Sequence, residues 1–245
     1  MTRRSVLLAI LALAAGAVTL GALGASGAEG RFARALARTE ALRTVHFEMR
    51  ATIRADSPYP EQAPAGGLLN QDVQASGDIA FPDRLHLVAP IGPPGEGETR
   101  ELVVIGDRAW SRVGGVWRRV VAFGASTDPR ALLEVLKGPG VVRFAGYALA
   151  GGAPTYHLQI DLNADALRER QVRAGQIGGS ALVGAGRLDV FIGVLDERIY
   201  RQEADIEERS GELAPGSGLY RVRTTYAVEW SGFDRPVDIR EPAGN

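Results

Sequence analysis

The longest alternation of apolar and polar positions in the chain runs from Tyr220 to Trp230. Its even-numbered positions hold large apolar, aromatic or threonine side chains, its odd-numbered positions are mostly charged, and only Ala227 blurs the pattern. A period of two is typical of a β-strand with one buried and one solvated face. At about 3.3 Å per residue such a strand is roughly 36 Å long. This length predicts a broad, strongly curved sheet.

The same period recurs along most of the chain. It is clear from Val45 to Ile53, where Val45, Phe47, Met49, Ala51 and Ile53 alternate with polar residues. Further strands are predicted over residues 72–81, 84–89, 101–105, 108–113, 116–121, 141–148, 155–162, 187–194 and 198–207. The segments between them are hairpin turns or irregular loops without regularly spaced crossover helices, which indicates antiparallel pairing.

Three segments have helical patterns instead. Apolar residues recur at helical spacing among arginines from Arg31 to Arg43. Asp128-Pro129 supplies a cap and a first-turn proline for a helix that runs to Lys137, and Asn163 can cap a third helix that runs to Arg173. The predicted fold class is therefore α+β: a strongly curved antiparallel sheet of about 10–11 strands, with helices on its concave face.

Gly114-Gly115 is the clearest turn in the sequence. A two-residue turn there places Arg112 opposite Trp117 and Trp110 opposite Arg119, so that both tryptophans lie on one face, interleaved with two arginines. Such an arrangement either stabilises neighbouring strands or holds a ligand headgroup through cation–π contacts.

The N-terminus has the pattern of an export signal. Arg3 and Arg4 precede an apolar run from Val6 to Leu23 and then small residues up to Ala28. We expect residues 1–28 to be a signal peptide cleaved after Ala28 or an uncleaved N-terminal membrane anchor, because the run is nearly long enough to span a bilayer. Residues 29–245 are predicted to form a single domain. We expect an exported protein of the cell envelope or the extracellular space; since the chain has no cysteine, it cannot be a lipoprotein acylated at a cysteine.

Composition argues against several other classes of function. The formal net charge is −1 and the arginines are scattered, which argues against nucleic acid as a partner. His46, His86 and His157 each occupy the polar side of an alternating strand, so we expect them to point to solvent and predict no metal site. Ser180 lacks the glycine and the preceding strand of a nucleophile elbow. We therefore predict no catalytic residue, no cofactor and no enzymatic activity.

The large apolar surface remains to be explained. If helices and loops stand away from the sheet, the gap is a cavity for apolar molecules; if they pack against it, the same residues form a core. The alternation is the same in both cases. For the lining of a cavity we select Phe47, Met49, Ile53, Leu85, Leu87, Leu132, Leu136, Leu158, Ile160, Val190, Ile192, Tyr226 and Val228, with Trp110 at the rim.

A set of short segments, in order, resembles the LppX/LprG family of bacterial cell-envelope lipid carriers, within the wider group that is similar to LolA and LolB. The resemblance covers roughly residues 31–242. The segments are Val45-His46-Phe47 after a helix, Val103 to Ile105 before Gly106-Asp107 and Trp110, Asp128-Pro129 with Leu132-Leu133, Thr155-Tyr156-His157 before Asp161, Asp189 to Ile192, and Trp230 with Pro236 to Ile239 and Pro242.

The resemblance implies a half-barrel sheet that encloses a hydrophobic cavity with its helices. It also implies non-enzymatic binding and transport of lipids or lipidated molecules between envelope layers. The expected partners are then a lipid or acylated ligand and a membrane surface or envelope transport partner, and we expect a monomer. The alternative is an envelope sensor or scaffold module of the same fold, which binds a protein partner without carrying lipid.

Overall fold

A computed structural model describes residues 27–56, 70–91, 97–120, 133, 136–137, 140–163, 165, 183–210 and 220–243. The elements in these residues are α2 (Ala28–Glu40), β1 (Thr44–Asp56), β2 (Asn70–Ala80), β3 (Arg84–Pro90), β4 (Thr99–Ile105), β5 (Arg108–Val113), β6 (Val116–Val120), β7 (Val141–Ala150), β8 (Ala153–Leu162), β9 (Val183–Gly193), β10 (Ile199–Ser210) and β11 (Tyr220–Ser231).

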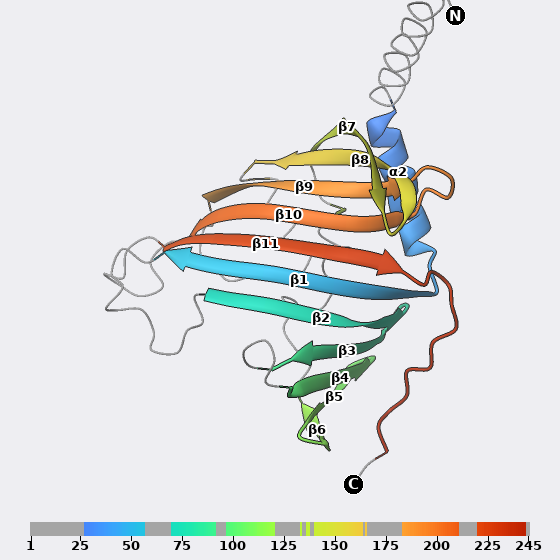
Figure 1. Cartoon of the computed structure of the whole chain (residues 1–245), viewed down its shortest axis with the longest axis vertical. Helices are drawn as coiled ribbons and strands as arrows, with labels where there is room; N and C mark the ends of the chain where they lie inside the picture. The colour runs from blue at the N-terminus through green and yellow to red at the C-terminus, as the bar shows by residue number, and fades with distance from the viewer. Residues whose placement is uncertain are drawn as a thin grey trace, which may run out of the picture.

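All eleven strands belong to one antiparallel sheet in the order β6-β5-β4-β3-β2-β1-β11-β10-β9-β8-β7 (Figure 1). The predicted strand from Tyr220 to Trp230 is confirmed as β11. It lies in the middle of the sheet, where it pairs with β1 on one side and β10 on the other. The sheet is curved and open, with β6 and β7 at its two edges, as the predicted fold class requires.

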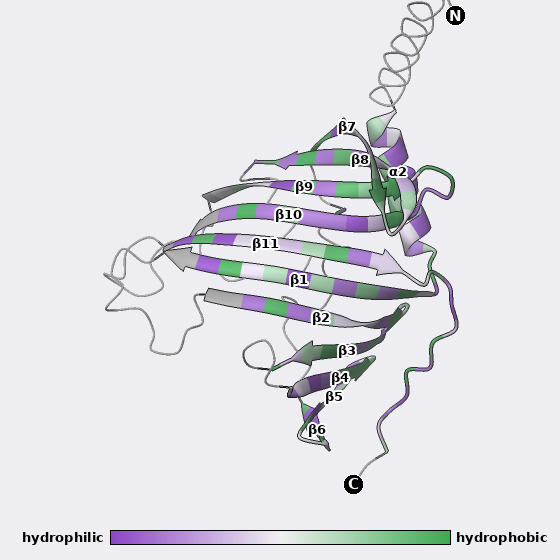
Figure 2. Cartoon of the chain, in the orientation of Figure 1, coloured by the Kyte–Doolittle hydropathy of each residue, from purple (hydrophilic) through white to green (hydrophobic). Residues whose placement is uncertain are grey.

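The alternation of the sequence divides the sheet into two faces, visible as changing colours along the strands in Figure 2. We call the face that carries Phe47 the inner face, and the face that carries His46 the outer face. Phe47, Ile79, Leu85 and Leu188 are at most 1% exposed on the inner face. The hydrophobic core therefore lies on the inner side of the sheet.

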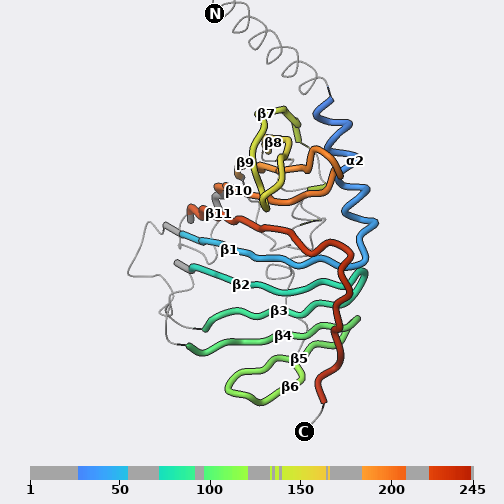
Figure 3. The backbone as a smooth tube through the Cα atoms, turned by 45° about the vertical axis from the view of Figure 1, so that its right-hand side comes forward, coloured from blue at the N-terminus to red at the C-terminus, as the bar shows by residue number. Residues whose placement is uncertain are grey.

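Helix α2 covers one end of this inner face. It runs along the strand ends from β7 towards β1 (Figure 3) and buries Phe32 and Ala35 in the core. The helix begins three residues before the predicted start at Arg31, because Ala28 already belongs to its buried stripe. It ends at Glu40, ahead of the predicted end at Arg43, because β1 begins at Thr44. No helix of the described residues is both long and apolar enough to cross a membrane.

The turn at Gly114-Gly115 is confirmed, with both glycines in the left-handed conformation that such a turn requires. Arg112 lies opposite Trp117 and Trp110 opposite Arg119, as predicted. The guanidinium of Arg112 lies 5.1 Å from the Trp117 ring and also pairs with Glu101. These contacts match the stabilising role that we considered for the hairpin.

After β11 the chain crosses the sheet and packs against the outer face (Figure 3). Ile239 is buried against Val103 and Trp110. Arg84 donates a hydrogen bond to the carbonyl oxygen of Ile239 over 3.1 Å, and Arg108 pairs with Glu241 at 2.7 Å. The C-terminal tail is thus an integral part of the fold.

Several predictions fall largely outside the described residues. Of the helix predicted up to Lys137, only Leu133, Leu136 and Lys137 are described, and Leu133 and Leu136 belong to the core. Of the helix predicted from Asn163 to Arg173, only Asn163 and Asp165 are described. Residues 1–26 and Ser180 are outside as well. The predicted signal cleavage after Ala28 would fall at the first residue of α2.

Candidate functional site

Strand register builds the inner face into continuous rows of uncharged, mostly apolar side chains. One row crosses the sheet through Val190, Gln202, Val228, Met49 and Ala75, each the direct cross-strand partner of the next. In β1–β3 and β8–β11, no inner-face position with a described side chain is charged. An uncharged surface that crosses so many strands is suited to contact with hydrocarbon.

The structure brings most of the predicted lining residues together. The members found in a single core cluster are Phe47, Met49, Leu85, Leu87, Leu136, Leu158, Ile160, Val190, Ile192, Tyr226 and Val228. Ile53 is on the same face of β1 and is half-buried. Leu132 lies outside the described residues. Whether these side chains contact a ligand stays a prediction.

Trp110 is not part of this group. In β5 the alternation places Ala109 on the inner face and Trp110 on the outer face, beneath the C-terminal tail. Trp110 is the direct partner of Val103, which is also on the outer face. The placement of Trp110 at the rim of the same cavity is therefore corrected, because β5 presents the neighbouring residue to the inner side.

In β1, β2 and β11, at the centre of the sheet, burial on the inner face decreases with distance from α2. On β1, Phe47 is 0% and Met49 8% exposed, and Ile53 is half-buried. On β11, Val228 is 0% and Tyr226 8% exposed, and Thr224 is half-buried. Val73 on β2 and Val222 on β11 are also half-buried. In these central strands the inner face is thus most accessible at the ends remote from α2, which we call the open end (left in Figure 1).

Gln202 is a residue of the inner face that the predicted site omitted. It is 0% exposed, and its amide nitrogen donates a hydrogen bond to the hydroxyl of Tyr226 over 2.9 Å. A buried amide requires such a partner. In β10 the charged residues Arg201, Glu203 and Asp205 occupy the odd-numbered positions, so the even-numbered position of Gln202 predicts that it faces the inner side. The predicted site omitted Gln202 because we considered only apolar residues for the lining.

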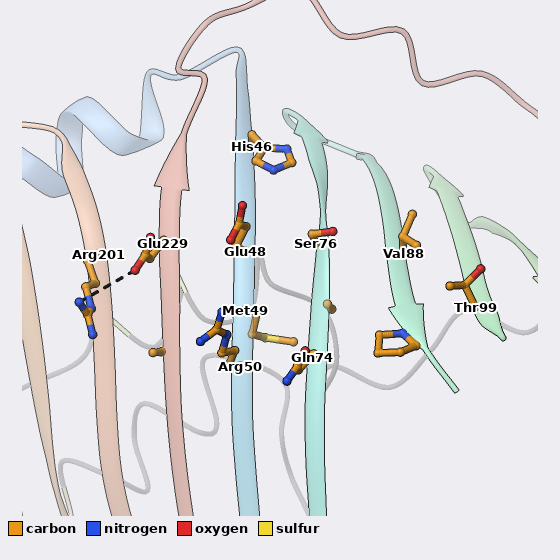
Figure 4. A pocket seen from close by; sticks show the side chains of 13 residues that line it. His46, Glu48, Met49, Arg50, Gln74, Ser76, Val88, Thr99, Arg201 and Glu229 are labelled. Carbon is orange, nitrogen blue, oxygen red and sulfur yellow. Dashed lines mark ion pairs between the residues drawn. The ribbon is translucent and has the colours of Figure 1, made fainter. Parts of the chain in front are cut away.

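The outer face carries a polar groove of about 430 Å³ over the middle of the sheet (Figure 4). His46, Glu48 and Arg50 of β1 line it, together with residues of β2, β3, β4, β10 and β11. Arg201 of β10 approaches Glu229, its direct partner on β11, to 3.9 Å at one side of the groove. This charged lining does not suit an acyl chain, so the two faces offer different chemistry.

The three histidines lie on the outer face, as the alternation predicts. His46 contacts Asp78 at 2.9 Å and His157 contacts Asp189 at 2.7 Å, while His86 is 3.9 Å from Glu101. Each acid lies on a neighbouring strand. The histidines therefore form separate polar contacts along the sheet.

Ion pairs between strands organise the rest of the outer face. Arg223 donates two hydrogen bonds to Asp205, over 2.9 and 2.6 Å, and these hold the pKa of the Asp205 carboxyl below its usual value. Arg54 likewise lowers the pKa of Asp72 by hydrogen bonding. Such exposed pairs contribute little stability individually.

Comparison with known proteins identifies the fold. No family model and no curated protein sequence matches the chain. Among solved structures, the chain is similar to the lipoprotein LppX of Mycobacterium tuberculosis, with a TM-score of 0.52 at 16% identity over 86% of this chain and 97% of LppX. It is also similar to LprF of Mycobacterium bovis, with a TM-score of 0.54 at 14% identity over 89% of this chain and 98% of LprF. The resemblance predicted from the sequence is thus confirmed at the level of the fold.

Proposed function

We propose that the protein binds and transports lipids or lipidated molecules in the cell envelope, without catalysing a reaction. The inner face holds the acyl chains. The observation that carries this proposal is an uncharged apolar face, in an LppX-like fold, whose burial in the central strands decreases towards the open end. The export signal predicted from residues 1–28 is consistent with a location in the envelope.

Burial of hydrocarbon supplies the driving force. Each methylene removed from water contributes about 0.8 kcal/mol, so a dozen methylenes contribute roughly 10 kcal/mol before the cost of ordering the chain. Ligand enters at the open end, where Ile53, Val73 and Val222 are partly accessible, and extends towards Met49 and Tyr226. A charged headgroup remains in water.

Thr224 and Thr225 offer a matched pair of variants to test this. They are adjacent in β11 and both half-buried, but Thr224 lies on the inner face beside Ile53, while Thr225 lies on the outer face beside Thr52. We expect Thr224→Arg to reduce uptake of a fluorescent fatty acyl probe on the order of tenfold or more, since it places a charge where the chain would bind. Thr225→Arg should bind like the parent protein.

Native mass spectrometry of protein purified from membrane-containing cells, followed by organic extraction, shows whether ligand is carried. Protein that is reproducibly empty and takes up no probe contradicts the proposal. Equal uptake by both threonine variants contradicts the assignment of the inner face. Leu158→Arg is less informative, because Leu158 is 0% exposed and a charge there disrupts the core itself.

A second candidate function is the binding of a protein partner at the outer groove. Glu48 and Glu229 lie directly opposite each other there, and like charges in that relation destabilise a sheet. In the described part of the chain, Glu48 has no ion pair, so a basic side chain of a partner would relieve the repulsion. Loss of partner capture in Glu48→Lys, with probe uptake intact, would favour this function.

A further inference from the structure

Large apolar side chains are exposed where the β7–β8 hairpin meets the turn between β9 and β10. Tyr147 is 53% exposed, Leu149 is 75% exposed and Leu195 is 93% exposed. We call these three residues the hairpin patch. Isolated exposed leucines are common, but neighbouring ones at the end of a fold commonly mark a contact surface.

The backbone holds the patch together. Leu149 is the cross-strand partner of Pro154, and the carbonyl oxygen of Pro154 accepts a hydrogen bond from the backbone N–H of Val194 over 3.0 Å. Val194 directly precedes Leu195. The hairpin and the turn are therefore fixed to each other, and their exposed side chains share one end of the sheet.

Aromatic rings extend the patch towards α2. The ring of Tyr147 lies 5.4 Å from that of Tyr156, which belongs to the same hairpin. The guanidinium of Arg31, in the first turn of α2, lies 3.6 Å from the centre of the Tyr156 ring. Tyrosine and arginine next to exposed leucine are typical of the boundary between lipid headgroups and acyl chains, where amphipathic side chains are stable.

Ion pairs attach α2 to the turn that carries Leu195. Glu197 contacts Arg34 at 2.8 Å and Arg38 at 3.5 Å. Together with the contact of Arg31 with Tyr156, these pairs hold α2 beside the hairpin patch (Figures 1 and 3).

The sequence ahead of α2 identifies the occupant of this surface. Four residues, 24–27, separate the apolar run from Val6 to Leu23 from Ala28. The five steps from Leu23 to Ala28 span at most about 18 Å even when fully extended. Where this run is retained as the membrane anchor that is the alternative to cleavage, a bilayer that holds it lies within reach of the hairpin patch. A bilayer is therefore a better candidate for covering the patch than a second copy of the chain.

We infer that the hairpin patch rests on a lipid bilayer, with Leu149 and Leu195 inserted among the acyl chains and Tyr147 at the headgroups. Arg31 lies beside them, where it meets anionic headgroups. This surface is separate from the open end of the inner face and does not depend on the carriage of lipid. Seated in this way, the protein would hold the open end away from the membrane that anchors it.

Single-cysteine labelling tests the inference on the full chain, which has no native cysteine. Leu195→Cys and Val116→Cys are labelled with an environment-sensitive fluorophore and mixed with vesicles of phosphatidylcholine and phosphatidylglycerol. Val116 is a matched control because it is an exposed apolar residue, 47% accessible, at the opposite edge of the sheet. Asp107→Cys is a second control, exposed in a turn at the same strand ends as Leu195.

We expect the emission of the Leu195 probe to shift to shorter wavelength with vesicles and to be quenched by spin-labelled phospholipid. The probes at Val116 and Asp107 should stay in water. A Leu195 probe that is as accessible to an aqueous quencher as the Val116 probe would overturn the inference. So would a shift that needs no vesicles and grows with protein concentration, because a second copy would then be covering the patch.

Discussion

The two faces of the sheet are built from the same strands but are held by different forces. On β11, Val228 is completely buried among apolar side chains, while its neighbour Glu229 is exposed and makes only a distant ion pair with Arg201. The inner face excludes water and determines the fold. Apart from the region covered by the C-terminal tail, the outer face carries mainly exposed charged pairs, whose loss changes stability little. A substitution should therefore act according to the face on which it falls.

The largest difference in stability is expected when aspartate replaces either of two adjacent residues that lie on opposite faces of the sheet. Val228→Asp places a carboxylate in the core and should lower the free energy of unfolding by about 4 kcal/mol or more, or prevent folding. Ala227→Asp, on the outer face between Arg50 and Glu203, should change it by less than about 1 kcal/mol. Urea denaturation followed by circular dichroism measures both. Similar losses at the two positions would contradict the division into faces.

Gly77 tests how tightly the inner side is assembled. It lies between Phe47 and Leu87, and a Cβ at Gly77 would be only 1.9 Å from the carbonyl oxygen of His86. Because the obstacle is backbone, Gly77→Ala should cost at least about 2 kcal/mol.

Gly30→Ala is the control for this substitution. The nearest atom to a Cβ at Gly30 is the flexible end of Arg34, 3.7 Å away, and alanine favours the helix. A thermal midpoint of Gly77→Ala equal to that of the parent protein would contradict the close approach of β2 and β3.

A smaller loss is expected from the polar pair on the inner face. Tyr226→Phe removes the hydroxyl that accepts a hydrogen bond from Gln202, and should lower stability by about 1–2 kcal/mol while preserving shape. Tyr200→Phe is a control at a hydroxyl that is only partly buried and bonds to Asp196. If Tyr226→Phe were as stable as the parent, the pair would contribute nothing to the inner face.

The smallest effect concerns pH. Hydrogen bonding from Arg34, and secondarily from Arg38, lowers the pKa of Glu197 below its usual value near 4.5. A carboxyl whose pKa is lower in the folded state stabilises the fold above its unfolded pKa, and the stabilisation disappears as the pH falls through the folded value. Glu197→Gln should thus cost under about 1 kcal/mol at pH 7 and nothing well below pH 4, since both arginine side chains are more than half exposed and solvent screens the pairs. If Glu197→Gln still lowered the free energy of unfolding in acid, the effect would come from the packing of the side chain and not from its charge.

Sequence alone predicted the strands well because most of them have one solvated and one buried face. The alternation located β1 and β11, and Gly114-Gly115 fixed the register of β5 and β6. Trp110 was wrongly predicted at the rim of the inner cavity, because β5 is short and carries apolar residues on both faces. The apolar residue on its outer face, Trp110 itself, is covered by the C-terminal tail. Local periodicity contains no information about a tail that returns from over a hundred residues away.

The candidate site was predicted less completely than the fold. Alternation assigns side chains to a face, so Phe47, Leu158 and Val228 were correctly grouped. It does not indicate how burial changes along the strands, because burial depends on where α2 packs. The open end near Ile53 and Thr224 therefore emerged only from the three-dimensional arrangement, and Gln202 was missed because a polar residue was not expected inside.

The pairing of β1 with β11 joins the first and last of the described strands at the centre of the sheet. The cross-strand partners run from His46 with Ser231 to Asp56 with Arg221, so more than 160 residues of sequence separate them. During synthesis β1 has no partner on this side until β11 has been made, and contacts between such distant residues form slowly. The centre of the sheet therefore stays incomplete while the intervening residues are made, and a polypeptide in that state can still be threaded through a narrow pore.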